Sequence, residues 1–284
     1  MKPNNAVADL AILVPLCASG KYLDRARAFQ KVGLLNAKKS RVHITALIGT
    51  DPVESFPQAW GHPAMWEGSA FNHVACKIYN HYASMHMDYI ESARWFMRVD
   101  DDSVTDVDGL VEYLDSNFNY TEPNYFHAHT NYDNAPHYRM AMEDTGYGHL
   151  VKRRVDGRWN ALPHEWECSV TSQAMMKRIF GNPDIRVFFG RLASYEGGFG
   201  DHGLAMAARM VKCAPSEVEF LAHDAPFDDF TGWDGGSCYH LHTVAPDIEE
   251  NWNYLQQKLQ ENPHLLQEVP GGVIEGNEEV EEKV

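Results

Sequence analysis

The fold of this chain is decided by one short stretch, Trp95-Phe96-Met97-Arg98-Val99-Asp100-Asp101-Asp102. An apolar run of this kind is typical of the end of a buried strand, so we expect the three aspartates where that strand leaves its sheet. In open α/β sheets, ligands bind outside the carboxyl ends of the strands. Adjacent carboxylates repel one another, and a hard divalent cation with oxygen ligands is the usual remedy. The stretch therefore predicts a metal-dependent site. The alternative interpretation is a solvated acidic turn that caps the following helix.

Strands and helices alternate through the first 130 residues around this stretch. Apolar runs predict strands at 10–16, 42–48 and 124–129, in addition to the strand that ends at Val99. Helical spacing of apolar residues predicts helices at 22–35 and 70–87. A third helix is expected after the triplet, with Thr105 as its N-cap and Asp108 in its first turn. This alternation predicts a mainly parallel sheet covered by helices.

The second half of the sequence is less regular. Residues 130–166 read as irregular, and they carry a basic cluster of Lys152, Arg153, Arg154 and Arg158. A short strand leading to a helix is expected over 169–180, and a further helix over 203–211. Ile248, Trp252, Leu255 and Leu259 have the spacing of an amphipathic helix. Gly and Glu dominate from Pro270, which predicts a disordered acidic tail over 270–284.

Composition limits the kinds of protein that this chain can be. The 284 residues are 44% hydrophobic, so a full-sized core is expected. The net charge of −16 argues against a large nucleic-acid footprint, because such binding relies on Lys and Arg. The five cysteines form no CxxC pair, which favours reduced thiols. No run of about 18 apolar residues predicts a membrane span, and no signal peptide is evident. We therefore expect a cytoplasmic protein.

Two further motifs carry candidate chemistry. Residues 195–203 read Tyr-Glu-Gly-Gly-Phe-Gly-Asp-His-Gly, so that Asp201 follows three glycines that allow close approach of a ligand. Asp201 is either a helix cap or a general base held over a cleft. The motif His240-Leu241-His242 places two imidazoles on one face of a strand, where they serve either as metal ligands or as structural residues.

The three motifs in this order resemble the GT-A glycosyltransferases, and more narrowly the fringe and β-1,3-glycosyltransferase group, in which the strand-end triplet occurs as DDD. The resemblance covers about residues 8–245. It implies a mixed Rossmann-like sheet flanked by helices, in a single catalytic domain over 1–269. A nucleotide-sugar-binding half would span about 8–130 and an acceptor half 131–269. The chain departs from the group in lacking paired acids before the glycine-containing turn and in lacking a membrane anchor.

The resemblance also assigns roles. Asp102 matches the metal-binding carboxylate, and Asp100 matches the acid near the ribose and the metal, with Asp101 beside it. His240 resembles the late metal ligand, and His242 is the near alternative. Asp201 matches the base of an inverting reaction, while Pro15 and Asp51 would line the nucleotide pocket. Mn²⁺ or Mg²⁺ is the implied cofactor, with Mn²⁺ favoured by an imidazole ligand. The implied substrates are a nucleotide sugar and a glycan or other hydroxyl-bearing acceptor.

Other interpretations of the acidic residues remain open. Asp100-Asp101-Asp102-Ser103-Val104 also fits the signature of haloacid-dehalogenase phosphatases, with Asp100 as nucleophile, Asp102 as acid and Mg²⁺ as cofactor. That signature normally lies on the first strand. An EF-hand-like calcium loop around 106–109 fails because Val104 would occupy the first ligand position. A noncatalytic module that binds nucleotide sugars or glycans is the remaining alternative.

Overall fold

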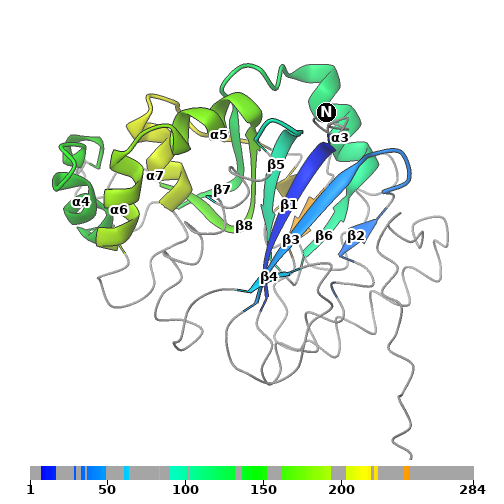
Figure 1. The fold of residues 1–284 in the computed structure, drawn as a ribbon, viewed down its shortest axis with the longest axis horizontal. Coiled ribbons are helices and arrows are strands. Elements are labelled where there is room, and N and C mark those ends of the chain that lie inside the picture. Colours follow the sequence, from blue (N-terminus) through cyan, green and yellow to red (C-terminus); the bar gives the residue numbers. More distant parts are fainter. Residues whose placement is uncertain are drawn as a thin grey trace, which may run out of the picture.

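The computed structural model has a mixed α/β architecture, with strands in two sheets and helices packed against them (Figure 1). The structure describes residues 8–16, 29, 33–35, 37–48, 61–63, 83, 90–100, 103–131, 136–151, 162–192, 203–218, 221–222 and 240–242. Among these residues, no helix is both long and apolar enough to cross a membrane.

The larger sheet has seven strands in the order β4-β3-β1-β5-β8-β7-β9. These are β1 (Ala8–Leu16), β3 (Val42–Ile48), β4 (Gly61–Pro63), β5 (Ala93–Val99), β7 (Tyr125–Asn131), β8 (Leu162–Ser172) and β9 (Ser216–Glu217). The first four strands in this order run parallel, whereas β8 runs antiparallel to both of its neighbours. The sheet is therefore mixed, as expected, with a parallel half built from the first part of the chain.

A second, smaller sheet contains β6, the strand that follows β5 in the chain. It has the order β10-β11-β6-β2. Its strands are β2 (Leu34–Leu35), β6 (Ser103–Asp106), β10 (Leu221–Ala222) and β11 (His240–His242). Since β5 ends at Val99 and β6 begins at Ser103, the acidic triplet is the connection between the two sheets.

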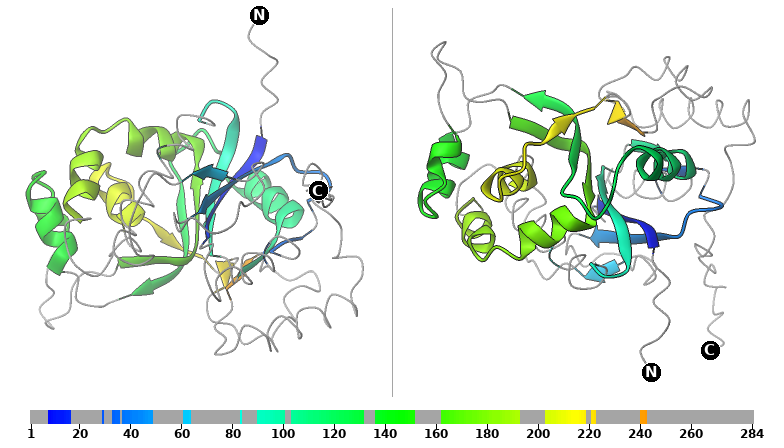
Figure 2. Two further views of the ribbon diagram at one scale, coloured as in Figure 1. Left: turned by 60° about the horizontal axis from the view of Figure 1, so that its bottom comes forward. Right: turned by 90° about the horizontal axis from the view of Figure 1, so that it is seen from above.

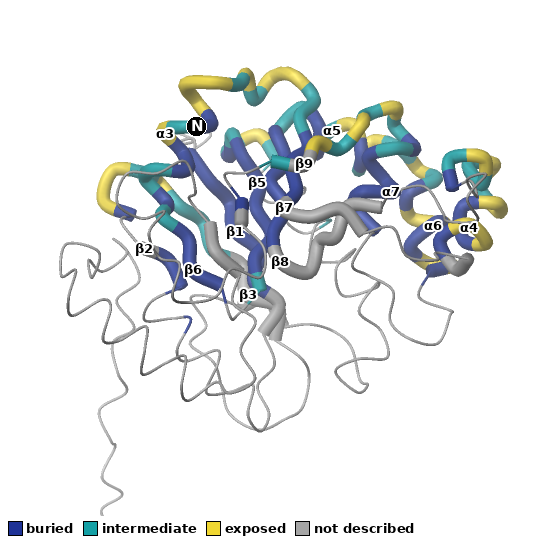
Figure 3. The backbone as a smooth tube through the Cα atoms, turned by 180° about the vertical axis from the view of Figure 1, so that it is seen from behind, coloured by how far each residue is buried: buried dark blue, intermediate teal, exposed yellow. Residues whose placement is uncertain are grey.

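Helices cover both faces of the larger sheet (Figure 2). On one face, α5 (Gln173–Phe180) and α7 (Gly203–Met210) pack against the sheet, α6 (Asp184–Leu192) packs against α7, and α4 (Pro136–Glu143) packs against α6 farther from the sheet (Figure 1). The other packs against α3 (Val107–Asn117). A short 3₁₀ helix, η2 (Gly148–Leu150), follows α4. Residues alternate along β5, so that Phe96 faces the first group of helices and Trp95, Met97 and Val99 face α3. The core strands are buried, and the helices expose their outer surfaces (Figure 3).

The longer strands of the parallel half of the sheet and three of the described helices were predicted from apolar spacing. The strands at 10–16, 42–48 and 124–129 correspond to β1, β3 and β7, and the strand before the triplet is β5. The helices after the triplet, after residue 172 and at 203 are α3, α5 and α7. The side chains of α3 that were expected to face inward are buried: Val107, Leu110, Val111 and Leu114.

Three expectations were wrong. Thr105 is not the N-cap of α3 but a residue of β6, and Asp106 takes the cap position, its carboxylate accepting the Gly109 N–H at 3.2 Å. The β6 pairing with β2 and β11 extends the chain past Thr105 and delays the helix. Residues 130–166 are not irregular throughout, because they contain α4, η2 and the start of β8. Leu34 and Leu35, which the helix expected over 22–35 would include, instead form β2, and Leu34 is buried.

Other expected elements lie outside the described residues. Of the helix expected at 70–87, Ala83 is described and is helical. The amphipathic helix expected at 248–259 and the acidic tail at 270–284 are also outside them.

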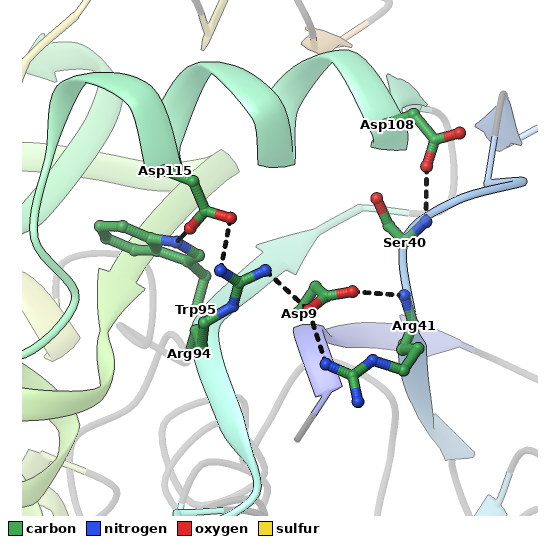
Figure 4. Close-up of polar contacts among 7 residues, drawn as sticks. All are labelled: Asp9, Ser40, Arg41, Arg94, Trp95, Asp108 and Asp115. Atoms are coloured by element: carbon green, nitrogen blue, oxygen red, sulfur yellow. Dashed lines mark hydrogen bonds and ion pairs between the residues drawn. The ribbon is translucent and has the colours of Figure 1, made fainter. Parts of the chain in front are cut away.

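A network of charges ties together the amino ends of β1 and β5 (Figure 4). The Arg94 guanidinium donates to Asp9 Oδ1 and to Asp115 Oδ2 of α3, at 2.6 Å each. The Trp95 indole N–H donates to Asp115 Oδ1 at 2.9 Å. Asp9 also accepts the Arg41 backbone N–H at 2.8 Å. These bonds connect two strands of the larger sheet, the start of β3 and helix α3 in one structural unit.

A second carboxylate on α3 organises the turn that precedes β3. The Asp108 side chain accepts the backbone N–H groups of Lys38, Lys39 and Ser40 at distances between 2.8 and 3.2 Å. Burial raises the pKa of Asp108, but the hydrogen bonds from Ser40 and from the two lysine N–H groups outweigh it and hold the pKa below its usual value. Asp108 therefore fixes where the chain enters β3.

The charge network predicts a loss of stability in acid that depends on Asp9. Burial raises the pKa of Asp9, but its bonds from Arg41 and Arg94 outweigh this and leave the pKa below its usual value. A depressed folded-state pKa gives stability that is full above pH ~4, where the unfolded carboxyl ionises, and is lost as the pH falls through the folded value. Asp9→Asn should lower the free energy of unfolding at pH 7 by about 2 kcal/mol, because it weakens two ion pairs of a buried carboxylate.

Urea denaturation between pH 2.5 and pH 7 measures this effect. The difference between wild type and Asp9→Asn should shrink below pH ~4. An exposed acid on α3, Glu112, provides the control, and Glu112→Gln should change stability by less than about 0.5 kcal/mol at every pH. A difference between wild type and Asp9→Asn that stays constant down to pH 2.5 contradicts the assignment.

Candidate functional site

The carboxyl ends of β1, β3 and β5 meet at one edge of the larger sheet. Leu13 of β1 is paired with Arg98 of β5, so two residues farther along these parallel strands Pro15 comes level with Asp100. Leu16 is paired with Ile48, the last residue of β3. Asp51 follows Ile48 by three residues and lies outside the described residues. Pro15 and Asp100, both expected to bind the donor, are therefore at the same edge of the sheet.

The first aspartate of the triplet is held by an arginine of the same strand. The Arg98 guanidinium nitrogen Nη2 donates to Asp100 Oδ1 at 3.2 Å. The Arg98 side chain is 4% exposed and that of Asp100 is 22% exposed. A buried guanidinium beside a half-buried carboxylate limits the positions that the carboxylate can take and cancels part of its charge. The Asp100 carboxylate is therefore held in place by Arg98, which cancels part of its negative charge.

A backbone hydrogen bond joins the two ends of the triplet. The Ser103 N–H donates to the Asp100 carbonyl oxygen at 3.2 Å, which links residues i and i+3 as in a β-turn. Asp101 and Asp102 are the two residues between these ends, and both lie outside the described residues. The chain therefore passes from the larger sheet to the smaller one through a short connection that contains the two carboxylates.

The histidine motif lies beside the strand that follows this connection. β11 is antiparallel to β6, with His240 opposite Thr105, Leu241 opposite Val104 and His242 opposite Ser103. Residues directly opposite each other in such a pair have Cα atoms about 4.5–5.5 Å apart. Two segments that are far apart in the sequence are thus neighbouring strands, and His242 is paired with Ser103, the residue that follows Asp102. The side chains of His240 and His242 are not among those described.

A row of polar residues, of which sequence reasoning overlooked Ser169 and His127, crosses the larger sheet next to Asp100. Arg98 is paired with Ser169 of β8, and Ser169 with His127 of β7. All three are buried, at 4%, 0% and 2% exposure. They share the face on which Phe96 and Tyr125 pack against α4–α7, one row nearer the carboxyl end of β5. The apolar face of the sheet thus becomes polar as it approaches the triplet. The signal in the sequence was that Arg98, Ser169 and His127 interrupt otherwise apolar strands.

The helix that follows Asp201 packs against the same face of the sheet. α7 begins at Gly203, two residues after Asp201, and its residues 204–208 are fully buried in the cluster that contains Phe96. A β-carbon at Gly203 would lie 2.6 Å from Phe189 of α6, so glycine is required for this close contact. Asp201 itself lies outside the described residues. The structure therefore fixes the start of α7 but not the position of the expected base.

The residue types near the triplet can be compared with the preferences of divalent ions. The aspartates follow β5, and the strand that contains His240 and His242 pairs with β6. Carboxylate oxygens suit Mg²⁺ and Mn²⁺, and an imidazole ligand would favour Mn²⁺ over Mg²⁺. The Ser103 Oγ is buried and forms no hydrogen bond with any residue that the structure describes, so a buried hydroxyl is available at the first residue after the triplet. The residues whose side chains are described contain no complete group of three ligands, and Asp101, Asp102, His240 and His242 are not among them.

Comparison with known proteins gives no assignment, because the chain matches no protein-family model and no curated protein. What is known of the site therefore comes from the sequence motifs and from the pairing of β6 with β11.

The unpaired hydroxyl of Ser103 leads to a prediction about stability. Ser103→Ala should leave the free energy of unfolding unchanged or raise it by up to about 1 kcal/mol, because it removes a buried polar atom without a partner. Ser172 is the matched control. Its buried Oγ accepts the Asn124 and Met175 N–H groups and donates to the Glu122 carbonyl at 2.6 Å. Ser172→Ala should therefore cost about 2 kcal/mol. Urea denaturation at pH 7 compares the two variants, and an equal loss of stability in both contradicts the prediction.

Proposed function

We propose that this protein is a metal-dependent glycosyltransferase with a GT-A-like fold, which transfers a sugar from a nucleotide-sugar donor to a hydroxyl group. The observation that carries the proposal is the pairing of β11 with β6, because it brings the His-x-His motif beside the residue that follows the Asp triplet. A cation held by these two motifs would stabilise the charge of the diphosphate that leaves the donor. The mixed sheet, with the triplet at the carboxyl end of a central strand, supports the same proposal.

In this proposal the metal is held by Asp102 and a histidine of β11. The resemblance favoured His240, but the register brings His242 opposite Ser103, whereas His240 lies two residues, or about 7 Å, farther along the strand. We therefore propose His242 as the metal ligand and keep His240 as the second candidate. When bound, the ion supplies charge stabilisation for the diphosphate that leaves as the glycosidic bond breaks.

The remaining residues bind and orient the substrates. Asp100, held by Arg98, accepts hydrogen bonds from the donor near its ribose, with Asp101 beside it. Pro15 and Asp51 line the nucleotide pocket at the ends of β1 and β3. Asp201, just before α7, removes the proton of the acceptor hydroxyl as that oxygen bonds to the sugar carbon. A single displacement of this kind inverts the anomeric configuration.

The phosphatase alternative is less well supported. It requires Asp100 as the nucleophile on the first strand, whereas Asp100 follows β5, after β1 and β3. Arg98 also occupies one oxygen of Asp100. A noncatalytic sugar-binding module remains a separate candidate, and it is distinguished from an enzyme by its failure to transfer or hydrolyse the donor.

The metal assignment predicts the effects of two substitutions. Asp102→Asn should keep the fold and lose Mn²⁺ and nucleotide-sugar binding together, because the ion connects the protein to the diphosphate. His242→Ala should weaken Mn²⁺ binding by about tenfold or more, while His149→Ala, an exposed histidine of η2, should not. Calorimetric titration with Mn²⁺, followed by thermal shifts with UDP, GDP, CDP and dTDP sugars, measures both steps. If His240→Ala loses Mn²⁺ and His242→Ala keeps it, the order of the two ligands is reversed.

The mechanism predicts a different result for Asp201. Asp201→Asn should bind donor and Mn²⁺ normally, since the base touches the acceptor, and its rate of transfer should fall by about 10²–10⁴-fold. Proton NMR of the product should give the inverted anomeric configuration. A product with retained configuration, or a variant with a near-normal rate, assigns Asp201 to helix capping.

A further inference from the structure

The pairing of β7 with β8 changes register between two histidines of β7. His127 is paired with Ser169, and two residues later His129 is paired with His164. Two steps along β7 therefore correspond to five steps along β8, so β8 contains three additional residues at this point. Continuation of the first register would have placed Glu167 opposite His129. Bulges are over-represented next to active sites, where they re-aim side chains. This bulge exchanges a glutamate for a histidine as the partner of His129.

The backbone register brings three histidines to one face of this strand pair. His127 and His129 are two residues apart in β7, and alternate residues of a strand lie on the same face. Tyr125 and His127 show this alternation, since their ring centroids are 6.4 Å apart. His164 is directly opposite His129, and residues in such a pair share a face with β-carbons about 4.5–5.5 Å apart. The side chains of His129 and His164 are not among those described, so the placement is that of the backbone.

Three histidines on one face have the composition of a transition-metal site. Imidazole is the commonest metal-binding side chain, and it suits zinc, copper and nickel, whereas carboxylates suit magnesium and manganese. Zinc sites with three histidine ligands keep the fourth tetrahedral position for water. The three Cα atoms are separated by about 7 Å along β7 and about 5 Å across to β8, which imidazole side chains can span to reach one ion.

From this register we infer that His127, His129 and His164 form a Zn²⁺ site, with water as the fourth ligand. The inference goes beyond the proposed function and does not depend on it. β7 lies two strands from β5 in the order β5-β8-β7, so the histidines are about 10 Å across the sheet from the strand that leads into the Asp triplet. The Zn²⁺ site is therefore distinct from the cation proposed for the triplet.

The test uses Co²⁺ as a spectroscopic substitute for Zn²⁺. The full chain, freed of metal and of any histidine tag, is titrated with Co²⁺. Wild type should develop the visible bands of four-coordinate Co²⁺, and about one equivalent of Zn²⁺ should remove them. His129→Ala and His164→Ala should each lose the bands. They should also weaken Zn²⁺ binding by about a hundredfold or more, because the loss of even an outer partner of a metal ligand costs about 10–100-fold.

Two controls separate this site from other histidines and from the triplet. His149→Ala removes an exposed histidine of η2 and should keep the bands. Asp102→Asn should also keep them, because the triplet is a separate site. A thermal shift provides the second readout: Zn²⁺ should raise the melting temperature of wild type and not that of His164→Ala. His127 is buried, so its smaller variant His127→Asn is compared with wild type in the metal-free state before the titration. If it does not fold, the other two variants still test the inference.

Each outcome supports or overturns the inference. No four-coordinate bands in wild type, or bands that persist in His129→Ala or His164→Ala, overturn it. Bands that persist in a folded His127→Asn overturn the three-histidine set. Loss of the bands in Asp102→Asn would mean that the histidines and the triplet hold one ion, which overturns the separate site. If the histidines bind Co²⁺ but no nucleotide sugar binds, the proposed transferase function fails and the Zn²⁺ site holds.

Discussion

The burial of β5 is the constraint on which the rest of the structure depends. Its apolar side chains are fully buried against helices on both faces, and β1 and β8 flank its two edges. A strand buried in this way cannot shift by one residue without moving its apolar side chains to the wrong face. The place where β5 ends is therefore fixed, and with it the edge of the sheet at which the aspartates emerge. The turn into β6 and the start of α3 follow from that point.

The arginines at the two ends of β5 have different ion-pair partners. At the amino end, Arg94, Asp9 and Asp115 form a network within the protein, which fastens β1, β5 and α3 together. At the carboxyl end, Arg98 is paired with Asp100, the first of three consecutive aspartates, and in the proposed function the triplet takes part in binding a cation. The first arrangement accounts for stability, and the second provides the basis for the proposed chemistry.

Sequence reasoning predicted the parallel half of the sheet because its strands are short apolar runs. It failed where tertiary pairing decides the local structure: β6 extends through Thr105 because β2 and β11 pair with it, and no local pattern indicates this. Helices α4 and α6 were missed because their exposed positions include Met140 and Val187, which weaken the apolar periodicity. The triplet was recognisable from its composition. The register that favours His242 over His240 depends on a pairing between distant segments, which the sequence does not encode locally.

The central claim is that the Asp triplet and the His-x-His strand form one cation site. The most direct measurement is anomalous X-ray diffraction at the manganese edge from crystals grown with Mn²⁺. The account predicts one anomalous peak within coordination distance of an aspartate of the triplet and of His242 or His240, at about 2.0–2.3 Å from the ligand atoms. A manganese peak bound elsewhere, with the triplet and β11 making no contact to it, would contradict the account.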